Sequence, residues 1–212
     1  MTAAHTKVSA AHRAFAAELS RLERFDAENQ RTFSAGTSPQ LSAHRLNVLT
    51  EAVFTSAFRA YEAYVREVFL LYARGKPTKA GKAVTSFLGP RSSLHAEQLI
   101  KQSKPFLDWS SPDAVIQRAD LFLKSGAPVK TVLSANSASL KTIKVVRNHI
   151  AHNSDESLSA YKKVVLAYFG TIPMQVPEPG AFLLLPSRAI PGVYLLKQYL
   201  QTISAVAAGL AA

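Results

Sequence analysis

Apolar residues recur every three or four positions through much of the chain, which is the spacing of one face of an α-helix. The first such stretch covers 6–32 and contains Val8, Ala11, Phe15, Leu19, Leu22 and Phe25. Gly36 then stops the helix, and Ser38 with Pro39 provides the start of the next one. We therefore expect an N-terminal helix within residues 1–35.

The next stretch, 39–73, contains no Gly or Pro after its first residue and predicts the longest helix. Its apolar positions alternate steps of four and three: Phe54, Phe58, Tyr61, Val65, Val68 and Tyr72. Leu46, Leu49 and Val53 extend this seam backwards. A seam of this kind is typical of a helix packed along other helices, so this helix is predicted to be the spine of a bundle.

Four more helices follow from capping signals and apolar stripes. They are 112–124 after Ser111 and Pro112, a helix from Asn136 or Ser137 to about Ala151, a helix after Asn153 ending at Gly170, and a closing helix through Val193 and Val206. Asn153 and Glu156 have the spacing of a capping box at the start of the third of these. In the second of these, Leu140, Ile143, Val146 and Ile150 form the stripe. The predicted fold class is all-α: an up-and-down helical bundle of about six to seven helices, forming a single domain over 1–212.

Two segments interrupt the helical pattern. Residues 74–92 carry several cations and glycines and predict a basic loop, and residues 170–192 form a Pro-rich irregular insertion before the last helix. Within the insertion, the apolar run Ala181–Leu185 is expected to form short strands or a small hairpin rather than a helix.

Composition narrows the partner class. The chain has 25 Lys and Arg against 14 Asp and Glu, a formal charge of +11, so we expect a polyanionic partner such as RNA. It has no cysteine, which excludes disulfides, thiolate metal sites and cysteine nucleophiles. The start of the chain lacks a secretory signal, and the apolar C-terminal stretch 198–212 is shorter than the ~20 residues of a membrane span. We expect a cytoplasmic protein without membrane contact.

The charge excess is concentrated in 74–104, where Glu97 is the only acid beside seven Lys and Arg. This stretch is either a solvated surface or a contact strip for RNA phosphates. In the second reading Lys76, Lys79 and Lys82 bind RNA.

The strongest chemical signal is Arg147-Asn148-His149-Ile-Ala-His152 at the end of a predicted helix. In RNA cleavage the 2′-hydroxyl is the nucleophile, so a protein needs only an acid or base near neutral pH and a cation for the charge on phosphorus. Histidine and arginine supply both without a metal. On a straight helix Arg147 and His152 lie about 140° apart, so their convergence requires a helix end near Ala151 or a second copy of the chain.

Two other interpretations of the motif stay open. His149 and His152 share a helix face and would suit a two-histidine metal site, but the sequence places no third ligand. Both would also suit ordinary capping and surface positions near a helix C-terminus.

The run Lys141–His152, an apolar helix that ends in Arg-Asn-x-x-x-His, resembles the Arg-x4–6-His signature of the HEPN superfamily of small all-α domains. The stretch Phe54–Phe69 is similar to the long early helix of the branches found in RNA-processing and defence systems. The resemblance covers about Gln40 to Phe169.

The resemblance implies a metal-independent endoribonuclease of toxin or phage-defence type that leaves 2′,3′-cyclic phosphate ends. It implies that Arg147 contacts the scissile phosphate, His152 is the general acid or base, Asn148 is a polar helper, and His149 has at most a role in RNA contact. It also implies a homodimer with facing motifs and no cofactor, and the sequence leaves open whether an antitoxin or other partner protein controls it. The alternative is a non-catalytic HEPN module that binds nucleotides or RNA or mediates dimerisation. A plain helical scaffold is a third class, but it leaves the basic strip unexplained.

Glu62 lies on an apolar helix face, with Phe58, Val65 and Phe69 as neighbours. A carboxylate in this position needs a partner. Arg147 is one candidate, and the pair would fix the guanidinium for phosphate contact. Arg59 or Arg66 is the other candidate, in which case Glu62 lies at the edge of the seam.

Overall fold

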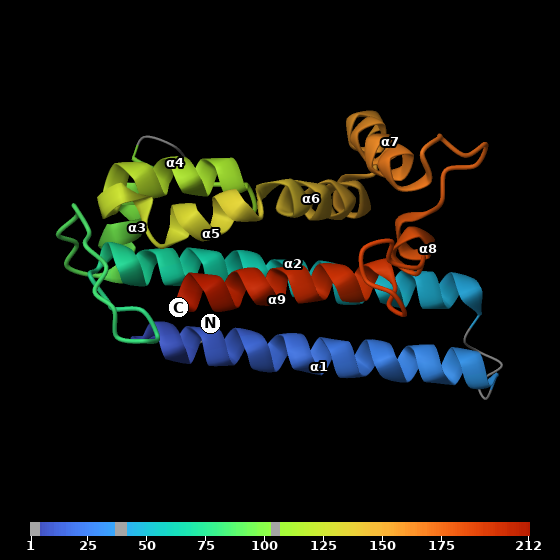
Figure 1. The fold of residues 1–212 in the computed structure, drawn as a ribbon, viewed down its shortest axis with the longest axis horizontal. Coiled ribbons are helices and arrows are strands. Elements are labelled where there is room, and N and C mark those ends of the chain that lie inside the picture. Colours follow the sequence, from blue (N-terminus) through green and yellow to red (C-terminus); the bar gives the residue numbers. More distant parts are fainter. Residues whose placement is uncertain (1–4, 37–41, 103–106) are drawn as a thin grey trace. The chain divides into compact units, whose positions relative to one another are not determined.

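The computed structural model describes residues 5–36, 42–102 and 107–212 and confirms the all-α fold class. Within these residues there are nine α-helices and one short 3₁₀ helix, and the extended contacts are two isolated bridges. The α-helices are α1 (Val8–Ala35), α2 (Ala43–Ala73), α3 (Ser93–Lys101), α4 (Pro112–Phe122), α5 (Val129–Ala135), α6 (Ser137–His152), α7 (Asp155–Phe169), α8 (Pro179–Leu183) and α9 (Leu195–Ala211) (Figure 1). The predicted number, six to seven, was too low because α3, α5 and α8 have nine residues or fewer.

The chain divides into two compact units. The first unit contains 1–17, 60–141 and 203–212, and the second contains 18–59 and 142–202. The helices α1, α2, α6 and α9 each contribute residues to both units.

The core of the first unit confirms the predicted seam of α2. Tyr61, Val65, Val68 and Tyr72 are all buried. The hydroxyl of Tyr64, on the same helix, donates to the Ala207 carbonyl of α9 at 2.8 Å, and its ring stacks on Phe15 of α1 with 5.0 Å between centroids. Phe69 meets the ring of Trp109 edge to face at 5.5 Å.

The basic loop 74–92 lies between α2 and α3 and is held to the first unit by backbone hydrogen bonds. The Lys79 N–H donates to the Ala211 carbonyl at 2.7 Å, and the Phe87 N–H donates to the Phe122 carbonyl at 2.9 Å. Val84 is buried. The backbone of the loop is therefore fixed while its lysine side chains extend from it.

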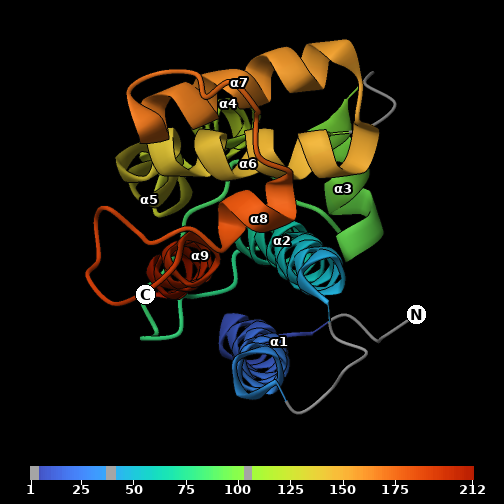
Figure 2. The same cartoon turned by 90° about the vertical axis from the view of Figure 1, so that its right-hand side faces the viewer.

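In the second unit, α7 turns across the direction of α6 (Figures 1 and 2), and the two helices meet where the ring of Tyr161 on α7 stacks on His149 of α6. The Tyr161 hydroxyl donates to the Pro177 carbonyl at 3.0 Å, and its ring meets Phe182 of α8 edge to face. Phe182 is fully buried. This packing ties the Pro-rich insertion to α7.

The prediction that Ala181–Leu185 is not helical was wrong, because α8 covers Pro179–Leu183. Proline fits the first turn of a helix, where its missing N–H costs no hydrogen bond. Just beyond α8, Pro186 and Tyr194 form one isolated antiparallel bridge, and the described residues of this segment form no strand.

The predicted apolar stripe of α1 has Phe25 as its last core position, but the structure buries Asp26 there instead. Val8, Ala11, Phe15, Leu19 and Leu22 are buried, but Phe25 is 43% exposed and Asp26 is only 4% exposed. The step from Leu22 to the next core position is four residues, which brings a carboxylate into the interior. Asp26 accepts a hydrogen bond from the Tyr194 hydroxyl there.

Among the helices in the described residues, none combines the length and the apolar character that crossing a bilayer would require.

Candidate functional site

The motif predicted from the sequence lies in the last turns of α6. Arg147 is half-buried, and its guanidinium carbon lies 5.6 Å from the ring centroid of Phe58, a fully buried residue of α2. Its Nη1 donates to Oδ1 of Asn148 at 3.1 Å. A guanidinium over an aromatic face is held by cation–π attraction. The structure thus brings Arg147 and Asn148 together, as the motif implied.

His152 is exposed and is the last residue of α6. The helix therefore continues one residue further than predicted, and His152 is not released from the regular spiral. Helical spacing keeps Arg147 and His152 about 140° apart on α6. Convergence of the two side chains of one chain on one phosphate is disfavoured by this spacing.

The predicted capping box of α7 was placed one residue early. Asn153 is not the cap: its φ of 43° lies in the left-handed region, and its N–H donates to the His149 carbonyl at 3.0 Å, which ends α6. Ser154 is the cap, with its hydroxyl accepting from the Ser157 N–H at 3.3 Å, and the Ser157 hydroxyl accepting from the Ser154 N–H at 2.9 Å. Ser157, at the third helical position, accepts the hydrogen bond from the N-cap N–H that the prediction gave to Glu156.

His149 is the buried imidazole of the motif, with 7% of its surface exposed. Its Nδ1 lies 3.0 Å from the Ser157 hydroxyl, and its ring stacks on Tyr161 with 4.8 Å between centroids. Burial lowers the pKa of His149, so the neutral form is favoured. Sequence reasoning gave this residue only RNA contact and placed Ile150 in the apolar stripe.

The signal for the burial of His149 was present in the spacing. Leu140, Ile143, Val146 and His149 follow one another in steps of three, and all four are buried, whereas Ile150 is half-buried. Counting His149 as a member of this stripe would have predicted its burial.

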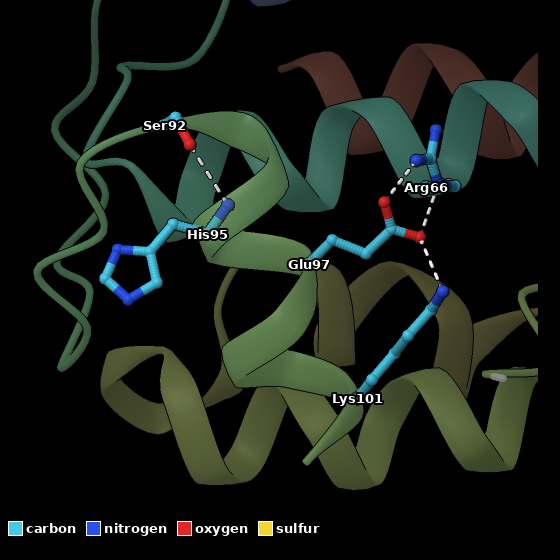
Figure 3. A network of polar contacts seen from close by, with 5 residues as sticks. All are labelled: Arg66, Ser92, His95, Glu97 and Lys101. Atoms are coloured by element: carbon cyan, nitrogen blue, oxygen red, sulfur yellow. Dashed lines mark hydrogen bonds and ion pairs between the residues drawn. The ribbon is translucent and has the colours of Figure 1, made fainter. Parts of the chain in front are cut away.

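Glu62 is half-buried on the part of α2 that belongs to the first unit, whereas Arg147 belongs to the second. Their pairing stays a prediction. Of the alternative partners, Arg66 forms a two-pronged ion pair with Glu97 of α3, with Nε of Arg66 3.2 Å from Oε1 (Figure 3).

The basic strip contains both paired and exposed cations. Lys101 lies 3.0 Å from the Glu97 carboxylate, next to Arg66, and the Ser92 hydroxyl caps α3 by accepting from the His95 N–H (Figure 3). The hydrogen bond from Arg66 holds the pKa of Glu97 below its usual range. Lys79 and Lys82 are exposed and Lys76 is half-buried.

The described residues contain no group of three or more His, Cys, Asp or Glu side chains placed to hold a metal ion. Comparisons of the chain with protein families, with curated proteins and with solved structures found no match.

Proposed function

We propose that the chain is a metal-independent endoribonuclease of the HEPN type that acts as a toxin or phage-defence effector. The observation that carries the proposal is the fixed guanidinium of Arg147, held by Phe58 and Asn148 and only half-buried, within five residues of the exposed imidazole of His152. A preoriented cation and an exposed imidazole are the two kinds of group that metal-independent phosphate chemistry uses.

The proposed reaction needs no group beyond these side chains and the RNA. The 2′-oxygen attacks the adjacent phosphorus, the bond from phosphorus to the 5′-oxygen breaks, and a 2′,3′-cyclic phosphate and a 5′-hydroxyl form. One imidazole takes the proton from the 2′-hydroxyl and another gives a proton to the 5′-oxygen. Arg147 stabilises the charge that develops on the phosphorane oxygens.

The spacing of α6 supports a site shared by two copies of the chain. Arg147 and His152 of one chain point about 140° apart. A second copy related by a two-fold axis supplies the second imidazole and completes the set of side chains around one phosphate.

A second candidate is a module that binds RNA or nucleotides without cleaving them. It is favoured by the helical spacing of α6, which keeps Arg147 and His152 of one chain about 140° apart. In that case neither Arg147 nor His152 contributes to a reaction.

Cleavage of total RNA in the presence of EDTA tests the proposal. His152→Ala is expected to lower the cleavage rate by about 10²–10⁴-fold and to leave RNA affinity within a few-fold, because the imidazole only moves a proton. Arg147→Ala is expected to lose both cleavage and affinity, since a guanidinium contacts phosphate before and during the reaction. Arg147→Lys keeps the charge but loses the planar fork, so it rescues only in part.

Lys163→Ala, which removes an exposed cation of α7, is the charge-matched control and is expected to cleave like the parent. The double variant Arg147→Ala with His152→Ala, purified in the same way, measures contaminating nuclease. Parent cleavage no faster than that background would reject the ribonuclease and leave the binding module, and equal rates for the parent and His152→Ala above that background would reject the role of His152. Loss of parent activity in EDTA would reject the metal-independent mechanism.

A further inference from the structure

The second unit contains an open pocket of about 420 Å³, within the range of small-molecule sites. It is lined by His44, Asn47, Val48, Glu51, His149, Ile150, Asn153, Leu158, Val176, Pro177, Glu178 and Pro179. His149 lies about 200° from Arg147 around α6, and the pocket is lined by His149 and not by Arg147. It is distinct from the proposed cleavage site.

One wall of the pocket is built around Glu51 of α2. This half-buried carboxylate accepts a hydrogen bond from the Gly180 N–H at 2.8 Å. Gly180 approaches α2 so closely that a Cβ atom there would lie 2.4 Å from the Asn47 carbonyl oxygen. The contact fixes the Pro-rich insertion against α2 and holds Glu51 in place, and a carboxylate keeps further lone pairs for a ligand.

His149 also lines the pocket, and its Nδ1 contacts the Ser157 hydroxyl. The Ser157 hydroxyl has one hydrogen, which it donates to the Ser154 carbonyl at 2.8 Å, and it accepts from the Ser154 N–H. His149 Nδ1 must therefore donate to the remaining lone pair of that hydroxyl. In neutral His149 the other ring nitrogen, Nε2, is then a hydrogen-bond acceptor.

The polar groups of the pocket select a class of ligand. Among its lining residues there are two carboxylates, Glu51 and Glu178, and neither Lys nor Arg, so a phosphate group is disfavoured inside. Six of the twelve lining residues are Val, Ile, Leu or Pro, which can contact a flat ring, and His44, Asn47, His149 and Asn153 are the other polar ones. With two carboxylates and neither Lys nor Arg, the pocket favours a planar ligand that presents N–H donors along its edge.

Guanine is the nucleobase that fits this requirement. Its N1–H and N2–H₂ groups are adjacent donors and form a two-pronged contact with a carboxylate. Adenine and cytosine each place a ring acceptor next to their amino group, which would face the negative oxygens of Glu51. Uracil has a single N–H between two carbonyls.

We propose that this pocket binds a guanine base, with Glu51 accepting from its Watson–Crick edge and the ribose and phosphate remaining outside. The choice of a nucleobase rests on the proposed function. Asn153 lines the pocket and directly follows His152, so a guanosine seated here lies at the same end of α6 as the proposed catalytic imidazole.

Calorimetric titration of the full chain with GMP and AMP tests the proposal without any cleavage step. GMP is expected to bind about tenfold or more tightly than AMP, the scale of one two-pronged base contact. Glu51→Gln is expected to remove that preference, while its amide oxygen still accepts from Gly180 and keeps the melting temperature. Val48→Trp, at a lining position that is 51% exposed, is expected to block binding by filling the pocket without changing Glu51. Glu28→Gln, an exposed carboxylate of α1, is the control.

Equal affinity for GMP and AMP, or GMP binding unchanged in both Glu51→Gln and Val48→Trp, would overturn the proposal. RNA cleavage without GMP binding would overturn the pocket and leave the ribonuclease, whereas selective GMP binding without cleavage would support the pocket and reject the ribonuclease. A non-cleavable trinucleotide with a central guanine distinguishes the two sources of the base. Tighter binding of the trinucleotide than of GMP assigns the pocket to RNA, and the reverse assigns it to a free nucleotide.

Discussion

Asp26 and Tyr194 show how a single polar residue is accommodated in the interior of the second unit. Burial raises the pKa of the Asp26 carboxyl, and the hydrogen bond from Tyr194 opposes that change. Because the pKa in the folded state lies above that in the unfolded chain, the folded state holds this proton more tightly. The contribution of Asp26 to the free energy of unfolding is therefore largest below about pH 4 and falls as the pH rises through the folded-state pKa.

Asp26→Asn removes the buried charge and keeps an oxygen that accepts from Tyr194. The variant is expected to gain stability over the parent as the pH rises from 3 to 7, by on the order of 1 kcal/mol. Urea denaturation at several pH values measures the difference. Glu28→Gln, at an exposed position of the same helix, is expected to show little pH-dependent difference. A difference for Asp26→Asn that shrinks with rising pH would contradict this account.

At the scale of elements, the boundary between α6 and α7 depends on three consecutive residues. His152 ends α6, Asn153 turns in the left-handed region, and Ser154 caps α7. Ser157 serves both the cap and the hydrogen bond to His149. The start of α7 and the orientation of the buried imidazole are therefore coupled.

Ser154→Ala removes the side-chain acceptor for the Ser157 N–H at the start of α7. The free energy of unfolding is expected to fall by about 1 kcal/mol, within the usual range for a lost N-cap. Ser159→Ala, at an exposed interior position of α7, is the matched control and is expected to stay within about 0.5 kcal/mol of the parent. Chemical denaturation of both variants measures the difference in the free energy of unfolding. Equal denaturation midpoints for Ser154→Ala and Ser159→Ala would exclude a capping role for Ser154.

The sequence predicted the long helices because each has a repeated apolar stripe and an end signal. Gly36 follows the end of α1, Ser111 caps α4, and Gly170 adopts a left-handed conformation after α7. Ser38 and Pro39, the predicted start of the second helix, lie outside the described residues. The short helices α3 and α5 contain too few turns for an apolar stripe to be recognised. The helix α8 was not predicted because it begins with a proline.

Contacts of the candidate site could be predicted only between residues that are close in the sequence. Arg147 and Asn148 are neighbours, and their contact followed from the motif. Glu51 carried no signal, because its partner Gly180 is 129 residues away along the chain. The two stripes at Asp26 and at His149 were predicted wrongly for one reason. In each, a polar residue occupies a core position because a hydroxyl outside its own helix satisfies it, and the periodicity of apolar residues alone does not reveal that hydroxyl.

At the scale of the whole molecule, charge is divided unequally between the two units. The first unit has 14 Lys and Arg against six Asp and Glu, and the second has 11 against eight. The proposed reaction site belongs to the second unit, while the basic loop belongs to the first. Long-range attraction of RNA is therefore expected to come chiefly from residues other than the motif.

Replacing Lys76, Lys79 and Lys82 by Gln tests whether the loop contacts RNA. The slope of log affinity against log salt is expected to flatten by about two to three units, at roughly 0.7–0.9 per phosphate contact. The same number of charges removed from the second unit, at Lys162, Lys163 and Lys197, is the control. An unchanged slope in the loop variant, or an equal change in both, would make the loop an ordinary solvated surface.

The proposed shared site also predicts the oligomeric state. Light scattering at micromolar concentration is expected to give twice the chain mass of 23.0 kDa. Mixing His152→Ala chains with parent chains is expected to lower cleavage by more than dilution alone, because each mixed dimer lacks one of the two imidazoles. A monomer that cleaves RNA at the parent rate would contradict a site built from two copies.

The contact between Phe69 and Trp109 has a spectroscopic consequence. Trp109 is the only tryptophan of the chain and lies in the first unit. Its fluorescence therefore reports on that unit alone, whereas circular dichroism averages the helices of both. Unfolding curves recorded by the two signals coincide if the units melt as one cooperative body and separate if they melt in turn, so the native chain carries its own probe for the cooperativity of its two halves.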